Sequence, residues 1–195
     1  MTEPSEQYWA SFGRFINRFA ETEQRLHSLL WEISGASIEV ARAAFGDARY
    51  DKIVTLINRI NDSRGEDEHP LFRRAVEQMG LISRMRNDLV HLGIALTDKG
   101  GMVSNHVKAM PGRAKAFTIT ADMLDKMTAD LKVITACITV CHIDRFGLPP
   151  DARELPFRDV AQRPWMYKPP PQSHEARGRR KPLSKRTHRP AAQRE

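Results

Sequence analysis

Long runs of apolar residues at alternating three- and four-residue spacing constrain the fold of this chain more than any other feature of its sequence. The first run lies between about Glu6 and Ile33, and its apolar residues share one face of a helix. These residues are Trp9, Phe12, Ile16, Phe19, Leu26, Leu30 and Ile33. One position on this face holds Glu23 in place of an apolar residue. The pattern predicts a long amphipathic helix that ends at Ser34-Gly35, because glycine favours a helix stop.

Three further segments carry the same helical spacing. A broken helix is predicted in two pieces, one from Ser37 to Phe45 and one from Tyr50 to Asn61. The polar stretch from Ser63 to Pro70 is predicted to be a loop. A long helix follows from Leu71 to Leu92, and a last one runs from Thr120 to Arg145. Unbroken helical spacing of this kind is typical of a helical bundle.

The helix from Leu71 to Leu92 is apolar on two sides. Its main seam includes Arg86, and a second stripe is formed by Leu81, Met85 and Leu92. A helix that is apolar on two sides is usually buried on two sides. We therefore expect the second side to face either another helix of the domain or a second copy of the chain.

Turn signals interrupt the helical pattern before the last helix. Lys99-Gly100-Gly101 and Pro111-Gly112 are both turn sequences, and short segments with strand character lie between them. We expect a small β-hairpin or extended insertion, with strands at Ile94–Thr97 and Met102–Val107. A third short strand is predicted at Ala116–Thr120.

The composition changes after residue 146, where 9 of the 12 prolines follow. A segment this rich in proline cannot bury enough apolar surface to offset the conformational entropy that its chain would lose on folding. We therefore predict one all-α domain over residues 1–146, an antiparallel four- to five-helix up-and-down bundle with the small β-hairpin insertion. Residues 147–195 are predicted to be a basic, largely disordered tail. Within it, the Trp165-Met166-Tyr167 cluster has the aromatic residues to dock on a folded surface.

The net charge of +7 belongs entirely to this tail. Residues 147–195 contain 12 Lys and Arg against 5 Asp and Glu, whereas residues 1–146 contain 19 of each kind. The predicted bundle therefore has no overall field that attracts a polyanion. The basic run from Arg177 to Arg189 either grips a phosphate backbone without sequence preference or only keeps the chain in solution.

Several classes of protein are disfavoured by what the chain lacks. No apolar run approaches the ~20 residues that a membrane-spanning helix needs, so no membrane association is expected. The first seven residues are acidic and polar, unlike a secretory signal. Two cysteines, Cys137 and Cys141, are too few for a disulfide framework, which favours a reducing, cytoplasmic setting. With His142 they suggest a metal site, but two small buried residues are the simpler interpretation, and we expect no metal or other cofactor.

The helix from Leu71 to Leu92 also carries the one constellation with catalytic potential, Arg86-Asn87-Asp88-Leu89-Val90-His91. Asn87 and His91 lie one helical turn apart on the same face, and Arg86 sits beside them. A polar strip on this face consists of Gly80, Arg84, Asn87 and His91. Gly80 has no side chain, so a neighbouring helix or a ligand can approach there.

This segment resembles the Arg-polar-X₃-His form of the HEPN motif, and the helix order over residues 6–146 resembles that of the HEPN superfamily. The resemblance implies a metal-independent endoribonuclease that works as a homodimer, with two motifs meeting across the interface. It also implies an alternative, because other HEPN proteins keep the fold and only bind nucleotides or partners. Family members often serve as toxins or in defence systems, so an antitoxin or regulatory partner is a further expectation.

The residues themselves suit RNA cleavage through the neighbouring 2′-hydroxyl. A histidine side chain normally titrates at about pH 6.5, so His91 can take or give a proton at neutral pH. Arg86 can place a planar, fixed positive charge against phosphate oxygens, and Asn87 can orient either group by hydrogen bonds. Arg84 is a candidate RNA-binding residue on the same strip.

A purely structural interpretation of these residues stands beside the catalytic one. Arg86 and Glu23 are opposite charges on the apolar faces of two helices, and an unpaired buried charge is costly. We therefore expect Glu23 to lie near Arg86, where it would fix the helix register or, in an enzyme, support the guanidinium. The sequence thus leaves three hypotheses: an RNA-cleaving enzyme, a non-catalytic interaction module, and a nucleic-acid binder that acts through its basic tail.

Overall fold

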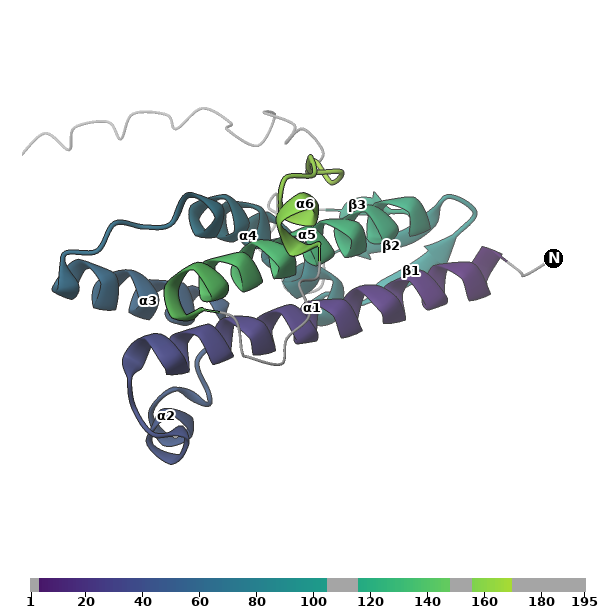
Figure 1. Ribbon diagram of the computed structural model, residues 1–195. Coiled ribbons are helices and arrows are strands. Elements are labelled where there is room, and N and C mark those ends of the chain that lie inside the picture. The colour runs from purple at the N-terminus through teal and green to yellow at the C-terminus, as the bar shows by residue number, and fades with distance from the viewer. Residues whose placement is uncertain (1–3, 105–115, 148–155, 170–195) are drawn as a thin grey trace, which may run out of the picture.

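The computed structural model describes residues 4–104, 116–147 and 156–169 (Figure 1). This part of the chain is mostly helical and includes a small three-stranded antiparallel sheet. The helices are α1 (Pro4–Ser34), α2 (Ile38–Phe45), α3 (Tyr50–Arg64), α4 (Pro70–His91), α5 (Ala121–Phe146) and α6 (Phe157–Ala161). The strands are β1 (Ile94–Thr97), β2 (Gly100–Ser104) and β3 (Ala116–Ile119). The mainly-α class predicted from the helical spacing is confirmed.

Local capping chemistry explains where the helices begin and end. The side chain of Ser37 accepts a hydrogen bond from the Val40 amide at the start of α2, and Thr120 does the same for Met123 at the start of α5. The end of α3 is formed by Gly65, whose positive φ of 66° suits a residue without a side chain. The loop predicted from Ser63 to Pro70 is shorter in the structure, because α3 reaches Arg64 and α4 begins at Pro70.

The direction of the helices differs in part from the predicted antiparallel arrangement. Helix α4 is antiparallel to α5, since Gln78 contacts Asp130 while His69, just before α4, contacts Asp144. Helix α1, however, runs parallel to α5 (Figure 1). Its contacts pair Ser11 with Asp125, Thr22 with Thr135 and Glu32 with His142. Helix α3 also follows the direction of α1 and α5, since Tyr50 at its start contacts Val76 of α4, while Asn61 near its end contacts Arg145 near the end of α5.

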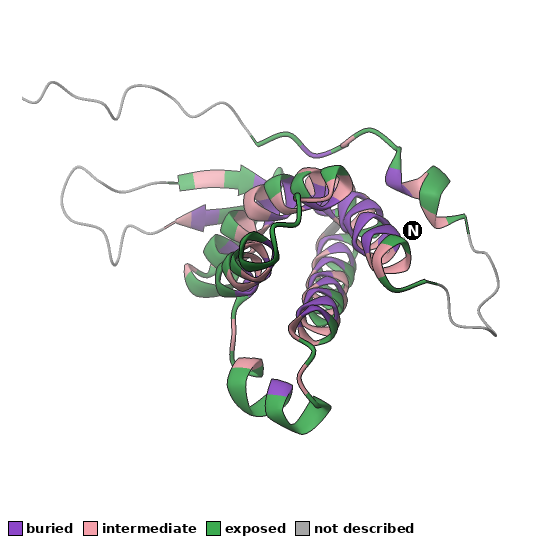
Figure 2. Cartoon of the chain, turned by 60° about the vertical axis from the view of Figure 1, so that its left-hand side comes forward, coloured by how far each residue is buried: buried purple, intermediate pink, exposed green. Residues whose placement is uncertain are grey.

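Burial on α1 departs from the seam predicted from its apolar spacing. Figure 2 shows the buried residues facing one another between the long helices. The buried apolar side chains of α1 are Tyr8, Phe15, Phe19, Leu26, Leu29, Leu30 and Ile33. Of the predicted seam, Trp9 is 45% exposed, and Phe12 and Ile16 are only half-buried. Helix α3 packs on the second half of α1 (Figure 1). The predicted seam in the first half of α1, at Trp9, Phe12 and Ile16, is therefore left partly uncovered.

The insertion between α4 and α5 is an antiparallel sheet in the order β1-β2-β3. Ile94 is paired with Val103, and Val103 with Phe117. The side chain of Val103, in the central strand, is fully buried in the core. Gly101 is buried because the Tyr8 ring of α1 lies directly against it. The predicted hairpin and third strand are present, but β2 begins at Gly100, inside the predicted turn, so its bounds differ from the predicted strand Met102–Val107. Residues 105–107 of that prediction and the turn predicted at Pro111-Gly112 lie outside the described residues.

The folded part extends past the predicted boundary at residue 146, because residues 156–169, which we call the C-terminal segment, pack on the helices; Trp165 and Tyr167 belong to the cluster that the sequence singles out for docking. Ala161 and Tyr167 are fully or almost fully buried against the helices, and α6 packs on α5. Figure 2 shows the segment crossing the helices from α6 in an extended form. Its composition alone disfavours folding, but the buried Asp130 supplies hydrogen-bond acceptors for its backbone, which composition does not reveal.

The glycine at position 80 allows a prediction about stability. The Tyr50 hydroxyl lies 3.5 Å from where a Cβ at Gly80 would be, which is ordinary van der Waals contact. Gly80→Ala is therefore expected to raise the free energy of unfolding by about 0.5–1 kcal/mol, the helix propensity gained without strain. Urea denaturation measures this, and Gly13→Ala on open helix surface is the matched control. A loss of stability in Gly80→Ala alone would mean that Tyr50 cannot accommodate the methyl group.

Candidate functional site

The predicted motif lies in the last turns of α4, on the surface. Asn87 and His91 are both exposed, and Arg86 is half-buried. The Arg86 Nη1 atom donates a hydrogen bond to the Asn87 Oδ1 atom at 3.1 Å. The structure therefore brings two of the predicted residues into direct contact and keeps the third on the same exposed stretch of helix.

The guanidinium of Arg86 packs on an aromatic ring of α1. Its guanidinium carbon lies 5.3 Å from the centre of the Phe19 ring, a cation–π distance. Its Nε atom is buried and has no hydrogen-bond partner within the part of the chain that the structure describes. The guanidinium is thus fixed at one end by the Phe19 ring, while Nη1 reaches Asn87 at the surface. This geometry leaves a rigid positive charge beside exposed polar groups.

Glu23 lies close enough to Arg86 for the two charges to interact. Burial raises the pKa of the Glu23 carboxyl, while the positive charges of Arg86, His27 and Arg49 act in the opposite direction. The ion pairs within 4.0 Å that join described residues do not include one between Glu23 and Arg86. Glu23 is therefore a partly desolvated carboxyl group whose charge interacts with that of Arg86, without a direct ion pair between the two side chains.

Arg84 is exposed on the outer face of α4, one turn before Asp88. Its positive charge acts on two buried tyrosines, Tyr50 of α3 and Tyr167 of the C-terminal segment, and lowers the otherwise raised pKa of each. The second stripe of α4 is used largely inside the chain, because Met85 and Leu92 pack against the hydrophobic core.

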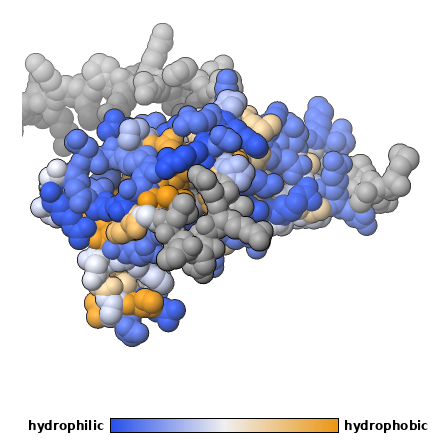
Figure 3. All heavy atoms as spheres, in the orientation of Figure 1, coloured by the Kyte–Doolittle hydropathy of each residue, from blue (hydrophilic) through white to orange (hydrophobic). Residues whose placement is uncertain are grey.

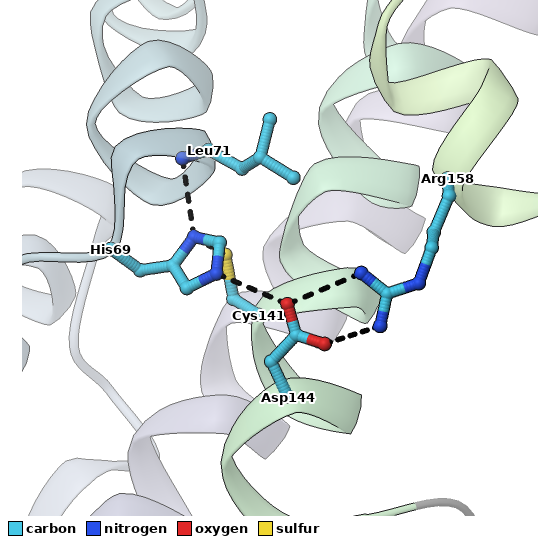
Figure 4. Close-up of polar contacts among 5 residues, drawn as sticks. All are labelled: His69, Leu71, Cys141, Asp144 and Arg158. Atoms are coloured by element: carbon cyan, nitrogen blue, oxygen red, sulfur yellow. Dashed lines mark hydrogen bonds and ion pairs between the residues drawn. The ribbon is translucent and has the colours of Figure 1, made fainter.

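A second polar cluster, which no sequence motif indicates, lies at the opposite end of α4. His69 lies in the stretch that the sequence predicts to be a loop, but it caps α4 by accepting a hydrogen bond from the Leu71 amide on Nδ1 at 3.2 Å. Figure 4 shows the imidazole between Cys141 and Asp144. The Cys141 Sγ atom lies 3.2 Å from Nδ1, and Nε2 lies 3.2 Å from the Asp144 carboxylate, which Arg158 also binds. The Pro70 that follows His69 is the one sequence signal of a helix start there.

This cluster borders a cavity of about 220 Å³ between α1, α3, α4 and α5. A thiol, an imidazole and a carboxylate in series form the arrangement of a nucleophile, a base and an orienting group. Burial, however, raises the pKa of Cys141 to about 12, so the thiol stays protonated. Hydrogen bonds from Arg158, and then from His69, lower the pKa of Asp144. The cluster ties α4, α5 and α6 together, and its acceptor nitrogen is already used by the helix cap.

The thiols provide a second prediction. Cys137 and Cys141 are buried, and at pH 8 a thiol of pKa about 12 is ionised in only about one molecule in 10⁴. Both cysteines are expected to resist iodoacetamide in the native chain and to react fully in denaturant, as counted by mass spectrometry. Rapid native modification of Cys141 would show an open, ionised thiol and revive a catalytic interpretation of this cluster.

The cysteines are two buried core residues, as the sequence predicts. His142, their neighbour in sequence, is instead bound to Glu32 of α1. Among the residues that the structure describes, no group of three or more histidine, cysteine or acidic side chains is arranged to hold a metal ion. No helix in these ranges has the length and apolarity needed to cross a bilayer.

The fold and the candidate site together define a mainly helical protein with an Arg-Asn-His motif on the surface at the end of one long helix. No protein-family model, curated protein or solved structure matches the chain.

Proposed function

We propose that the chain is a metal-independent endoribonuclease of HEPN type, built on a helical bundle of that superfamily. The observation that carries the proposal is the accessible motif: Arg86 donates to Asn87 at the surface, and His91 is exposed one turn further along α4. A phosphodiester can reach all three side chains without opening the core. Glu23 supports the guanidinium from α1, and Arg84 extends the positive surface.

The reaction that suits these groups is transesterification within the RNA. An imidazole takes the proton of the 2′-hydroxyl, and the 2′-oxygen then attacks the adjacent phosphorus. The bond from phosphorus to the 5′-oxygen breaks, and a second imidazole in its protonated form gives that oxygen a proton. Arg86 stabilises the charge that develops on the phosphorane oxygens. The products are a 2′,3′-cyclic phosphate and a 5′-hydroxyl.

A homodimer would supply the second imidazole. Apolar surface near the motif supports this part of the proposal, because Val90 is 46% exposed and Trp9, at the same end of the molecule, is 45% exposed. Phe12 and Ile16 continue the strip from Trp9 toward Phe19, the residue beneath Arg86. A second copy placed on this strip would bring its own His91 toward the first.

The test is a cleavage assay with purified chain in EDTA. We expect single-stranded RNA to be cut with cyclic phosphate ends, while DNA of the same sequence and RNA with 2′-O-methyl riboses stay intact, since both lack the attacking hydroxyl. Absence of RNA cleavage at every enzyme concentration tested would refute the proposal.

A non-catalytic partner-binding module is the second candidate, and one observation favours it. Figure 3 shows apolar atoms gathered at α2, where Ile38 and Val40 are each 58% exposed. Such a patch is typical of a surface that a partner covers, such as an antitoxin or a regulatory protein. An inactive chain that nevertheless binds a partner through Ile38 would favour this candidate over the enzyme.

A further inference from the structure

We propose that the cavity between α1, α3, α4 and α5 binds a small primary amine with a compact apolar body and a hydrogen-bond acceptor next to the ammonium group. The cavity is lined by His69 and Phe72 at the start of α4, so it lies at the end of this helix opposite to the motif at residues 86–91. The inference therefore goes beyond RNA cleavage and does not depend on it.

The apolar part of the cavity wall is suited to a small ring. Its residues come from α1, α3 and α4, and each is at most 3% exposed: Leu29, Ile33, Ile57 and Phe72. An apolar cavity of about 150 Å³ is known to hold a benzene molecule. The volume of about 220 Å³ is therefore large enough for a phenyl ring with a short side chain. Transfer of that ring from water onto these side chains is the main source of affinity.

A buried amide gives the cavity a free hydrogen-bond donor. Asn61, near the end of α3, lines the cavity and is only 7% exposed. Its Oδ1 atom accepts a hydrogen bond from Nη1 of Arg145 at 2.9 Å. A guanidinium can only donate, so the amide oxygen must face Arg145 and the Nδ2 group is directed elsewhere. The hydrogen bonds that join described residues include none from Nδ2, and the acceptor of the ligand satisfies this donor.

The charged groups that line the cavity leave one carboxylate unpaired. Arg145 donates to the carboxylate of Glu66, so this pair is neutral. The carboxylate of Asp144 is neutralised in the same way by Arg158. Asp67 also lines the cavity, and it forms no ion pair within 4.0 Å with any residue in the described ranges. The cavity therefore has a net charge of one carboxylate, which attracts a cation.

His69 adds no positive charge to this balance. Its Nδ1 atom accepts the hydrogen bond of the Leu71 amide, so this nitrogen carries no proton. The ring proton is then on Nε2, which faces Asp144 at 3.2 Å (Figure 4). The imidazole that caps α4 is therefore neutral. An ammonium group pairs with Asp67, whereas a carboxylate in the ligand is repelled by it. Because Asn61 and Asp67 line the same small cavity, the acceptor and the ammonium group must be close together in the ligand.

The first test compares three ligands of one shape with the full chain, by isothermal titration calorimetry. The probe is 2-amino-1-phenylethanol, for which a dissociation constant of about 10⁻⁴ M is expected from its roughly ten non-hydrogen atoms. Phenylethanediol replaces the ammonium with a neutral hydroxyl and should bind about fivefold more weakly, the usual upper value for an exposed ion pair. Mandelate replaces it with a carboxylate and should bind more weakly still. Absence of saturable binding by the amine, or tighter binding of mandelate, would overturn the proposal.

The second test locates the amine at the cavity. Asp67→Asn is expected to weaken its binding about fivefold, because only the ion pair is removed. Asp62→Asn is the matched control, since Asp62 is exposed on the last turn of α3 and does not line the cavity. In the unmodified chain, the side-chain amide resonances of Asn61 should shift as the amine is added. Equal affinity of the two variants, or Asn61 resonances that stay unchanged at saturation, would overturn the proposal.

Discussion

His91→Ala is expected to lower the rate of RNA cleavage by about 10²- to 10⁴-fold, the usual contribution of one general acid or base. The side chain is exposed at the end of α4, so its removal leaves no cavity and should not lower the free energy of unfolding by more than about 0.5 kcal/mol. In a homodimer both sites would lose an imidazole at once. The measurement is a single-turnover cleavage assay beside a thermal melt of the same preparation.

A matched control for this variant is His106→Ala, which removes the same side chain from a position outside the described residues. It should cleave RNA like the unmodified chain. Full activity in His91→Ala would remove the imidazole from the mechanism, whereas equal loss in both variants would point to an indirect effect.

Asp130→Ala is expected to lower the free energy of unfolding by about 3 kcal/mol. The carboxylate is fully buried and accepts hydrogen bonds from two backbone amides and from Gln78. Each buried donor left without an acceptor costs about 1–3 kcal/mol, and the total is limited because the C-terminal segment can detach and regain water. Urea denaturation measures the loss, and limited chymotrypsin digestion at Tyr167, which is buried in the docked segment, reports detachment of the segment.

Asp122→Ala is the matched control on the same helix. Asp122 is exposed and pairs with Lys126 at 2.7 Å on the surface, where an ion pair contributes at most about 1 kcal/mol. If both variants unfold at the same urea concentration, Asp130 does not hold the segment. Faster digestion of Asp130→Ala with unchanged overall stability would show that the segment opens separately from the helices.

Helix positions were predictable because their causes are local. The three-four spacing, the Ser37 and Thr120 caps and the glycines after the helices all act within a few residues, and the observed bounds follow them closely. The strands of the insertion were predictable for the same reason, since turn residues separate them. The exposed placement of Asn87 and His91 agrees with their shared face on α4.

The sequence by itself thus determined which segments are helical, which residues share a helix face and where the charge lies. Only the tertiary structure decided that α1 runs parallel to α5, that Trp9 stays exposed and that the C-terminal segment docks on Asp130. The same holds for the cluster of His69, Cys141 and Asp144. The physical reason is distance along the chain: these contacts join residues far apart in sequence, where periodicity and capping carry no information, and packing selects the partners.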